Sequence, residues 1–314
     1  MTALLAEVVR SGYVEGRHHG SVVALRPDGS VALAVGDVDR PVFPRSSNKP
    51  LQAVGLLEAG WNPLDERHLA LAASSHSGEP DHLTAVQELL GDLVLQTPAA
   101  PPIDAAAWHA LLRAGGSATS LTMTCSGKHA AMLRTCVVNG WSTHDYLDPE
   151  HPVQRACLRA VETLAGERVA HVAVDGCGAP QHAVSLTGLA RAFGRIASAE
   201  LHLEARRTAS AMRTHPWYVG GTGRDVTALM EGLPGLVAKD GYEGVYAVGL
   251  ADGSAVALKV EDGAERARTP VLVAALRLLG VDGSVLEQYA TTPVLGGNVV
   301  VGEVRVAGSL VRQV

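Results

Sequence analysis

Ser46 and Lys49 lie three residues apart, just before an apolar run that begins at Leu51. Residues three apart share one face of a helix. A serine hydroxyl becomes a strong nucleophile when a base takes its proton, and a lysine amine can be that base where burial or a neighbouring cation lowers its pKa. The plainer interpretation is a capped helix followed by a solvated lysine, and this spacing alone leaves both open.

Lysine is scarce in this chain, which favours the chemical interpretation. Of 26 basic residues only four are lysines, at positions 49, 128, 239 and 259. Arginine keeps its proton at any working pH, whereas lysine can lose it. The retained lysines are therefore candidates for positions that need an amine.

A second serine-rich break occurs at Ser74–Glu79, between a small-residue stretch and a helix expected from Pro80. A hydroxyl at such a break can donate to substrate or act as a second nucleophile, and His76 could orient substrate. The alternatives are N-capping of the next helix and a histidine that satisfies local backbone groups.

Two cysteines stand beside glycines in polar turns. Cys125 precedes Lys128 at an expected helix start, where partial positive charge lowers a thiol's pKa. Cys177 follows Asp175 at the end of an expected strand, and Asp175 could hold a substrate ammonium group. The pattern is open to a reactive thiol, an anion site, a soft divalent metal site such as zinc, or small buried cysteines.

Lys259 falls on an expected strand, where alternation places it on the same face as Ala257. A lysine on a face of small residues could point into a cleft. A solvated strand lysine is the alternative.

The elements that must position these residues are strands at both ends of the chain and helices between them. Strands are expected within residues 4–35 and again within 244–306, and a helix is expected to open at the Ser46 segment. This order predicts an α/β (α+β) fold, with one antiparallel sheet built from N- and C-terminal strands and covered by helices. We expect a single domain over residues 1–314, with a helical subregion at about 65–240.

Composition limits the function classes. The chain is 47% hydrophobic and 4% aromatic, so a large core must be built from Ala, Val and Leu. A net charge of −6 argues against nucleic acid as the main partner. No apolar run approaches the roughly 18 residues of a membrane span, and the N-terminus lacks the pattern of a signal peptide, so we expect a cytoplasmic protein without a disulfide framework.

Taken together, five motifs resemble the Rhizobium etli-type L-asparaginases. The motifs come in that family's order and cover most of the chain. The resemblance implies a fold similar to serine β-lactamases and penicillin-binding proteins, and hydrolysis of L-asparagine to L-aspartate and ammonia. The motifs are Ser46–Lys49, Ala73–Glu79, Cys125–His129, Asp175–Pro180 and Leu258–Gly263.

The resemblance also implies roles for individual residues. It gives two catalytic pairs, Ser46 with Lys49 and Ser75 with Lys259. It implies that a zinc ion near the substrate is held by two cysteines and a lysine. The residues concerned are Arg45 and Asp175 for substrate binding and Cys125, Lys128 and Cys177 for zinc. We expect His76 and His129 as further substrate-binding residues.

The expected mechanism is attack by one serine, with Ser46 favoured, to form an acyl-enzyme that water hydrolyses. Lys49 would serve Ser46 and Lys259 would serve Ser75, because two close amines disfavour each other's charged form. We expect L-asparagine as the partner and a homodimer as the assembly. The alternatives are another serine–lysine amidohydrolase of the β-lactamase or penicillin-binding type, and a non-enzymatic protein that binds a metal or an amino acid.

Overall fold

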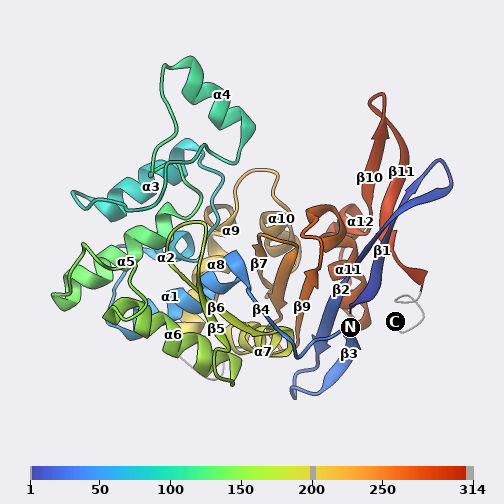
Figure 1. Ribbon diagram of the computed structural model, residues 1–314, viewed down its shortest axis with the longest axis horizontal. Helices are drawn as coiled ribbons and strands as arrows, with labels where there is room; N and C mark the ends of the chain where they lie inside the picture. The colour runs from blue at the N-terminus through green and yellow to red at the C-terminus, as the bar shows by residue number, and fades with distance from the viewer. Residues whose placement is uncertain (1, 199–202, 309–314) are drawn as a thin grey trace.

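The computed structural model describes residues 2–198 and 203–308. Its main feature is an eight-stranded antiparallel sheet with strand order β10-β11-β1-β2-β9-β8-β7, in which β3 pairs with β2. The N-terminal hairpin β1–β2 therefore lies inside the sheet, between β11 and β9 from the C-terminal third. This confirms the predicted architecture, in which both ends of the chain build one sheet and helices cover it (Figure 1).

The described residues also form a smaller sheet of order β4-β6-β5. The strands are β1 Ala3–Arg10, β2 Tyr13–Leu25, β3 Val31–Val35, β4 Pro41–Val42, β5 His171–Val174, β6 Pro180–Ser185, β7 Val237–Gly241, β8 Val245–Gly249, β9 Ala255–Val260, β10 Thr292–Gly296 and β11 Val299–Val306. The α-helices are α1 Lys49–Glu58, α2 Glu66–Ala72, α3 Pro80–Leu90, α4 Ala105–Arg113, α5 Ser126–Asn139, α6 Pro152–Ala165, α7 Leu186–Ala197, α8 Leu203–Thr214, α9 Pro216–Val219, α10 Asp225–Gly232, α11 Arg268–Leu278 and α12 Ser284–Tyr289. Two 3₁₀ helices are η1 Arg45–Asn48 and η2 Glu265–Ala267.

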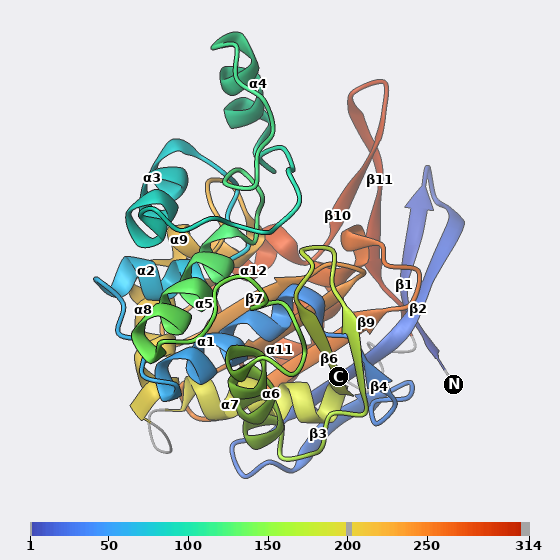
Figure 2. The same ribbon diagram turned by 60° about the vertical axis from the view of Figure 1, so that its left-hand side comes forward.

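Helices α1 to α6 gather on one side of the molecule. Figure 1 shows α1 to α6 to the left of the sheet, with the hairpins β1–β2 and β10–β11 at its right. In Figure 2 both hairpins and helix α4 project from the body of the protein. No helix in the described part of the chain is long and apolar enough to span a bilayer.

Small residues let α7 pack closely on the sheet. A Cβ at Gly249 in β8 would collide with the carbonyl of Phe193 in α7, and a Cβ at Gly194 would collide with the carbonyl of Gly253. Glycine at these positions therefore permits backbone contact between helix and sheet. The buried apolar side chains of the sheet and the covering helices form one continuous cluster, rich in Ala, Val and Leu as expected from the composition.

The small sheet explains why distant segments meet at the site. Strand β4 leads into η1, and its partner β6 follows the turn at Asp175. The turn is closed by hydrogen bonds from Asp175 N to Ala179 O and from Gly178 N to Asp175 O, both 2.9 Å long. The pairing of β4 with β6 thus brings the Ser46 segment next to Asp175 and Cys177.

Candidate active site

The segment that carries Ser46 is a 3₁₀ turn that continues directly into helix α1. Pro50 occupies the first turn of α1, as expected, where a missing N–H costs nothing. Asn48 is the N-cap residue, but its side chain makes no capping bond and instead donates to Gln181 Oε1 at 3.3 Å. Arg45 has φ of 53°, a strained conformation for a residue other than glycine. Such strain is common at functional sites.

Lys49 is buried, with 2% of its surface exposed, so the interpretation as a solvated lysine is wrong. Its Nζ donates to the backbone carbonyl of Ser74 and lies 3.0 Å from Ser75 Oγ. The helix therefore directs Lys49 toward the second serine-rich segment. Lys49 pairs with Ser75, whereas the sequence had suggested a pair with Ser46.

The structure does not bring Ser75 and Lys259 together as the predicted pair. Strand β9 directs Lys259 away from the serines, and its Nζ donates to the carbonyls of Glu243 and Val260. Lys259 lines a separate small pocket beside Arg40. The alternation of side chains along β9 separated the two faces of the strand, but it could not show which face lies toward the serines.

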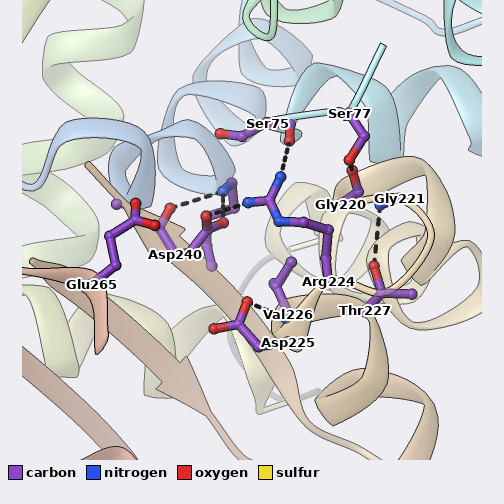
Figure 3. Close-up of polar contacts among 12 residues, drawn as sticks. Ser75, Ser77, Gly220, Gly221, Arg224, Asp225, Val226, Thr227, Asp240 and Glu265 are labelled. Carbon is purple, nitrogen blue, oxygen red and sulfur yellow. Dashed lines mark hydrogen bonds and ion pairs between the residues drawn. The ribbon is translucent and has the colours of Figure 1, made fainter. Parts of the chain in front are cut away.

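Ser75 is held by a loop that precedes α10. Ser75 N donates to Val219 O at 3.0 Å, and Ser77 N donates to Gly220 O at 2.9 Å. The Arg224 guanidinium donates to the backbone carbonyl of Ser75 at 3.4 Å (Figure 3). The serine-rich break is thus fixed by backbone contacts on one side and by Lys49 on the other.

Ser46 and Ser75 line the same cavity, which has a volume of about 840 Å³. We call it the serine cavity. It is large enough for a small amino acid and its surrounding water. Its other lining residues are Ile103, Thr124, Gly223, Arg224, Asp225, Asp240, Tyr242, Glu265, Arg266, Arg268, Thr269, Gln288, Tyr289, Thr291, Thr292 and Pro293.

A buried ionic cluster stands beside the cavity and was not predicted. Lys239 in β7 is fully buried, and its Nζ donates to the carboxylate of Asp240. The same carboxylate accepts from Arg224 Nη2 at 2.6 Å. Burial lowers the pKa of Lys239 to about 8, against the attraction of Asp240 and with the help of the charge on Lys49. The scarcity of lysine was the available signal for Lys239.

Cys125, Lys128 and Cys177 come together, as the sequence suggested. All three side chains are buried, and Lys128 Nζ lies 3.2 Å from Cys177 Sγ. The hydrogen bond with Cys125 and the charge of Lys128 hold the pKa of the Cys177 thiol far below its usual range, although burial opposes this. The same hydrogen bond raises the pKa of Cys125. One thiolate is therefore stabilised at this point.

These three side chains fit a zinc site in the chemistry of their donors. Both cysteines are free thiols in one small cluster with Ala179, and thiolate is a preferred zinc ligand. Among the described residues no group of three or more His, Cys, Asp or Glu side chains could hold a metal. A three-donor site therefore depends on the Lys128 amine, which must lose its proton to bind a metal.

Arg45 and Asp175 form an ion pair with each other. Arg45 Nε donates to Asp175 Oδ1 at 2.8 Å, and the guanidinium lies 5.4 Å from the ring centre of Tyr242. Asp175 also lies beside the cluster of two thiols and Lys128, since its Oδ2 is 3.8 Å from Cys177 Sγ. The pair thus sits between the thiols and Tyr242 in the wall of the serine cavity.

The two histidines predicted to bind substrate are fully buried and do not line the serine cavity. His76 Nε2 is 2.9 Å from Ser126 Oγ, and its ring stacks near His82. His129 Nδ1 is 2.9 Å from the hydroxyl of Tyr146. Burial lowers the pKa of both, to about 4 for His129. The structure thus buries both neutral rings and does not bring them to the serine cavity.

Comparison with known proteins gives one strong match. A family model described as L-asparaginase II matches residues 6–306. No curated protein sequence matches the chain.

Several solved structures align at low identity. Mglu aligns with a TM-score of 0.46 and 15% identity, covering 84% of this chain and 68% of that chain. Mglu in its glutamate form gives 0.47 and 16%, covering 84% and 62%. A β-lactamase from Mycobacterium bovis gives 0.38 and 13%, covering 86% and 94%. The chain thus spans about two thirds of the length of the Mglu chains.

Proposed function

Because the chain belongs to the L-asparaginase II family, whose members are amidohydrolases that act on L-asparagine, we propose that it hydrolyses the side-chain amide of L-asparagine by serine–lysine catalysis in the serine cavity. The observation that supports this mechanism is the contact of 3.0 Å between the buried Lys49 Nζ and Ser75 Oγ. A serine hydroxyl at a cavity wall with an amine at hydrogen-bond distance is the arrangement that nucleophilic catalysis requires.

In this proposal Ser75 is the nucleophile and the amine of Lys49 is the base. Ser75 Oγ attacks the side-chain amide carbon while its proton passes to Lys49. The tetrahedral intermediate then expels ammonia, which takes that proton, and an acyl-enzyme ester remains. Water attacks the ester, gives a proton to Lys49 and releases aspartate as the proton returns to Ser75. Each proton taken is given back within one turnover.

Ser46 supports the same reaction from the opposite segment. The sequence favoured Ser46 as the attacking residue, but Lys49 contacts Ser75. Because Ser46 also lines the serine cavity, its hydroxyl is placed to donate to the substrate.

Arg45 and Asp175 offer complementary charges for the amino-acid end of the substrate. A free α-amino acid carries one carboxylate and one ammonium group, so it can add to an existing ion pair with each charge facing its opposite. The Arg45–Asp175 pair lies next to Tyr242 of the cavity wall. We assign substrate carboxylate to Arg45 and substrate ammonium to Asp175.

Zinc would be held by Cys125, Cys177 and Lys128. Bound there, the ion would supply a Lewis acid and a fixed positive charge near Asp175. The hydrolytic steps above do not pass through it. The protein is further proposed to be cytoplasmic and to act as a homodimer.

The test is release of ammonia from L-asparagine by the wild type and by Ser75→Ala, with Ser46→Ala in parallel. Ser74→Ala is the matched control, because Ser74 Oγ is buried without a hydrogen-bond partner among the described residues. We expect Ser75→Ala to lose activity by about a hundredfold or more and Ser74→Ala to keep most of it. Full activity in Ser75→Ala would transfer the nucleophile to Ser46, and no ammonia from the wild type would refute the function.

A further inference from the structure

The carboxylate of Asp240 joins two cations directly behind Ser75. It accepts from Lys239 Nζ on one oxygen and from Arg224 Nη2 on the other. Arg224 in turn donates to the backbone carbonyl of Ser75 (Figure 3). Asp240 therefore fixes a lysine and the loop of the proposed nucleophile at the same time.

The other end of this network reaches the Ser46 segment. The backbone carbonyl of Lys239 accepts a hydrogen bond from Ser47 Oγ at 3.0 Å. Ser47 is adjacent to Ser46 in η1. Strand β7 and the Asp240 carboxylate thus connect the segments of both cavity serines, which lie far apart in the sequence.

Electrostatics give Asp240 a specific task. Lys239 has no solvent exposure, and a buried amine tends to lose its proton. The carboxylate of Asp240 opposes that loss, while the charges of Lys49 and Arg224 promote it. The other titratable or charged groups around this cluster are Asp225 of α10, Tyr246 of β8, Glu265 of η2 and Arg268 of α11.

We propose that Asp240 is a positioning residue that keeps Lys239 protonated at neutral pH and holds its positive charge behind the two serines. This rests on the proposed function. Lys239 then supplies a fixed cation that stabilises negative charge at the attacked carbonyl. Lys49 Nζ lies 3.0 Å from Ser75 Oγ and is the amine that exchanges the Ser75 proton.

The direct test follows the charge of Lys239 by NMR in the full-length protein. With ¹³C-labelled lysine the chain shows only four side-chain Cε signals, and Lys239→Arg identifies the relevant one. We expect Lys239 to titrate near pH 8 in the wild type. Asp240→Asn removes the anion that favours the ammonium, so the midpoint should fall by about one pH unit or more.

Two variants separate positioning from general destabilisation. Asp240→Glu keeps the negative charge, so the titration midpoint of Lys239 should lie close to its wild-type value. Asp225→Asn removes a neighbouring carboxylate that makes no hydrogen bond to Lys239 in the described structure, and should leave the midpoint unchanged. An unchanged midpoint in a folded Asp240→Asn protein would overturn the proposal. If that variant does not fold, a wild-type midpoint below 7 would overturn it.

Kinetics give a second readout. If the Lys239 ammonium is required, the alkaline limb of kcat/KM against pH follows its deprotonation. Asp240→Asn should move this limb to lower pH, in the same direction as the NMR midpoint, and Asp240→Glu should move it back. A limb that stays in place while the wild type hydrolyses asparagine would contradict the inference alone. A wild type without asparaginase activity would contradict the proposed function, and the NMR titration would still test Asp240.

Discussion

Lys49 and Ser75, 26 residues apart in the sequence, meet with Nζ and Oγ at 3.0 Å inside the protein. Helix α1 carries the amine, and a loop hydrogen-bonded to Val219 and Gly220 carries the hydroxyl. Neither element alone would hold this distance. The contact makes Lys49 the amine best placed to activate a serine of the serine cavity.

Replacing Lys49 tests its contact with Ser75 against the pairing of Ser75 with Lys259 that the sequence had suggested. Lys49→Met keeps an unbranched apolar stem but removes the amine, so we expect kcat/KM for asparagine to fall by about 10² to 10⁴, the usual contribution of a general base. Lys49→Arg should be equally impaired, because a guanidinium keeps its proton.

Lys259→Met is the matched control for Lys49→Met. Lys259 contacts the carbonyls of Glu243 and Val260, away from the serine cavity. We expect its activity to stay within about twofold of the wild type, with a change in stability below about 1 kcal/mol. A severe loss of activity in Lys259→Met would restore the pair suggested by the sequence.

These two lysines show what the sequence could and could not predict. The helix after Ser46 followed from Pro50 and the apolar run, and the sheet followed from alternating strands at both ends. Helical spacing put Ser46 and Lys49 on one face, but the side chain of Lys49 is long and turns to a partner that only tertiary packing supplies.

Strand β7 illustrates a different limit. Its sequence, Val-Ala-Lys-Asp-Gly, contains two charges and a glycine, which are unfavourable in strands, and it was not predicted. Lys239 and Asp240 can both be buried because the Asp240 carboxylate pairs with Lys239 and with Arg224. Local propensity cannot reveal such pairing. In contrast, the grouping of Cys125, Lys128 and Cys177 came from the resemblance to a known family, and the three side chains do lie together.

Asp175 offers a test of substrate recognition. Asp175→Asn removes the negative charge while keeping the size of the side chain, so the substrate ammonium would lose a charge-assisted hydrogen bond of about 1.5–3 kcal/mol. We expect KM for asparagine to rise by about 10- to 100-fold, with a smaller effect on kcat.

The loss of substrate binding must be separated from the loss of the Arg45–Asp175 ion pair. Asp175 also holds Arg45, whose backbone is strained, so thermal unfolding should be measured in the same variant. Arg45→Lys keeps a cation at the other end of the pair. If Asp175→Asn lowers kcat and leaves KM unchanged, Asp175 does not bind the substrate ammonium.

Metal content tests the thiol cluster. We expect the wild type to bind about one zinc per chain, and Cys177→Ala and Cys125→Ala to lose it, because each removes a thiolate ligand. Cys157→Ala is the control, since Cys157 is buried in α6 outside the cluster. Zinc is measured by elemental analysis after dialysis. Equal zinc in Cys177→Ala and the wild type would eliminate the site.

Buried neutral histidines predict a loss of stability in mild acid. Burial lowers the pKa of His182 to about 4 from 6.5, and burial together with the charges of His82 and Lys49 lowers the pKa of His76 well below its usual value. The unfolded chain therefore binds protons between pH 6.5 and 4 that the folded protein does not, so the free energy of unfolding falls as the pH falls through this window. For His182 the loss approaches about 3 kcal/mol.

Urea unfolding at several pH values from 7.5 to about 4 checks this sign. His182→Gln removes one titrating group and should flatten the decline, whereas substitution of the exposed His171 should leave the slope unchanged. Carboxylates held in ion pairs, such as Asp240 with Arg224, add to the decline only at lower pH, because their pKa values lie below the usual range. A wild-type stability that is constant between pH 6.5 and 5 would show that the histidines are protonated in the folded protein or are hydrated there.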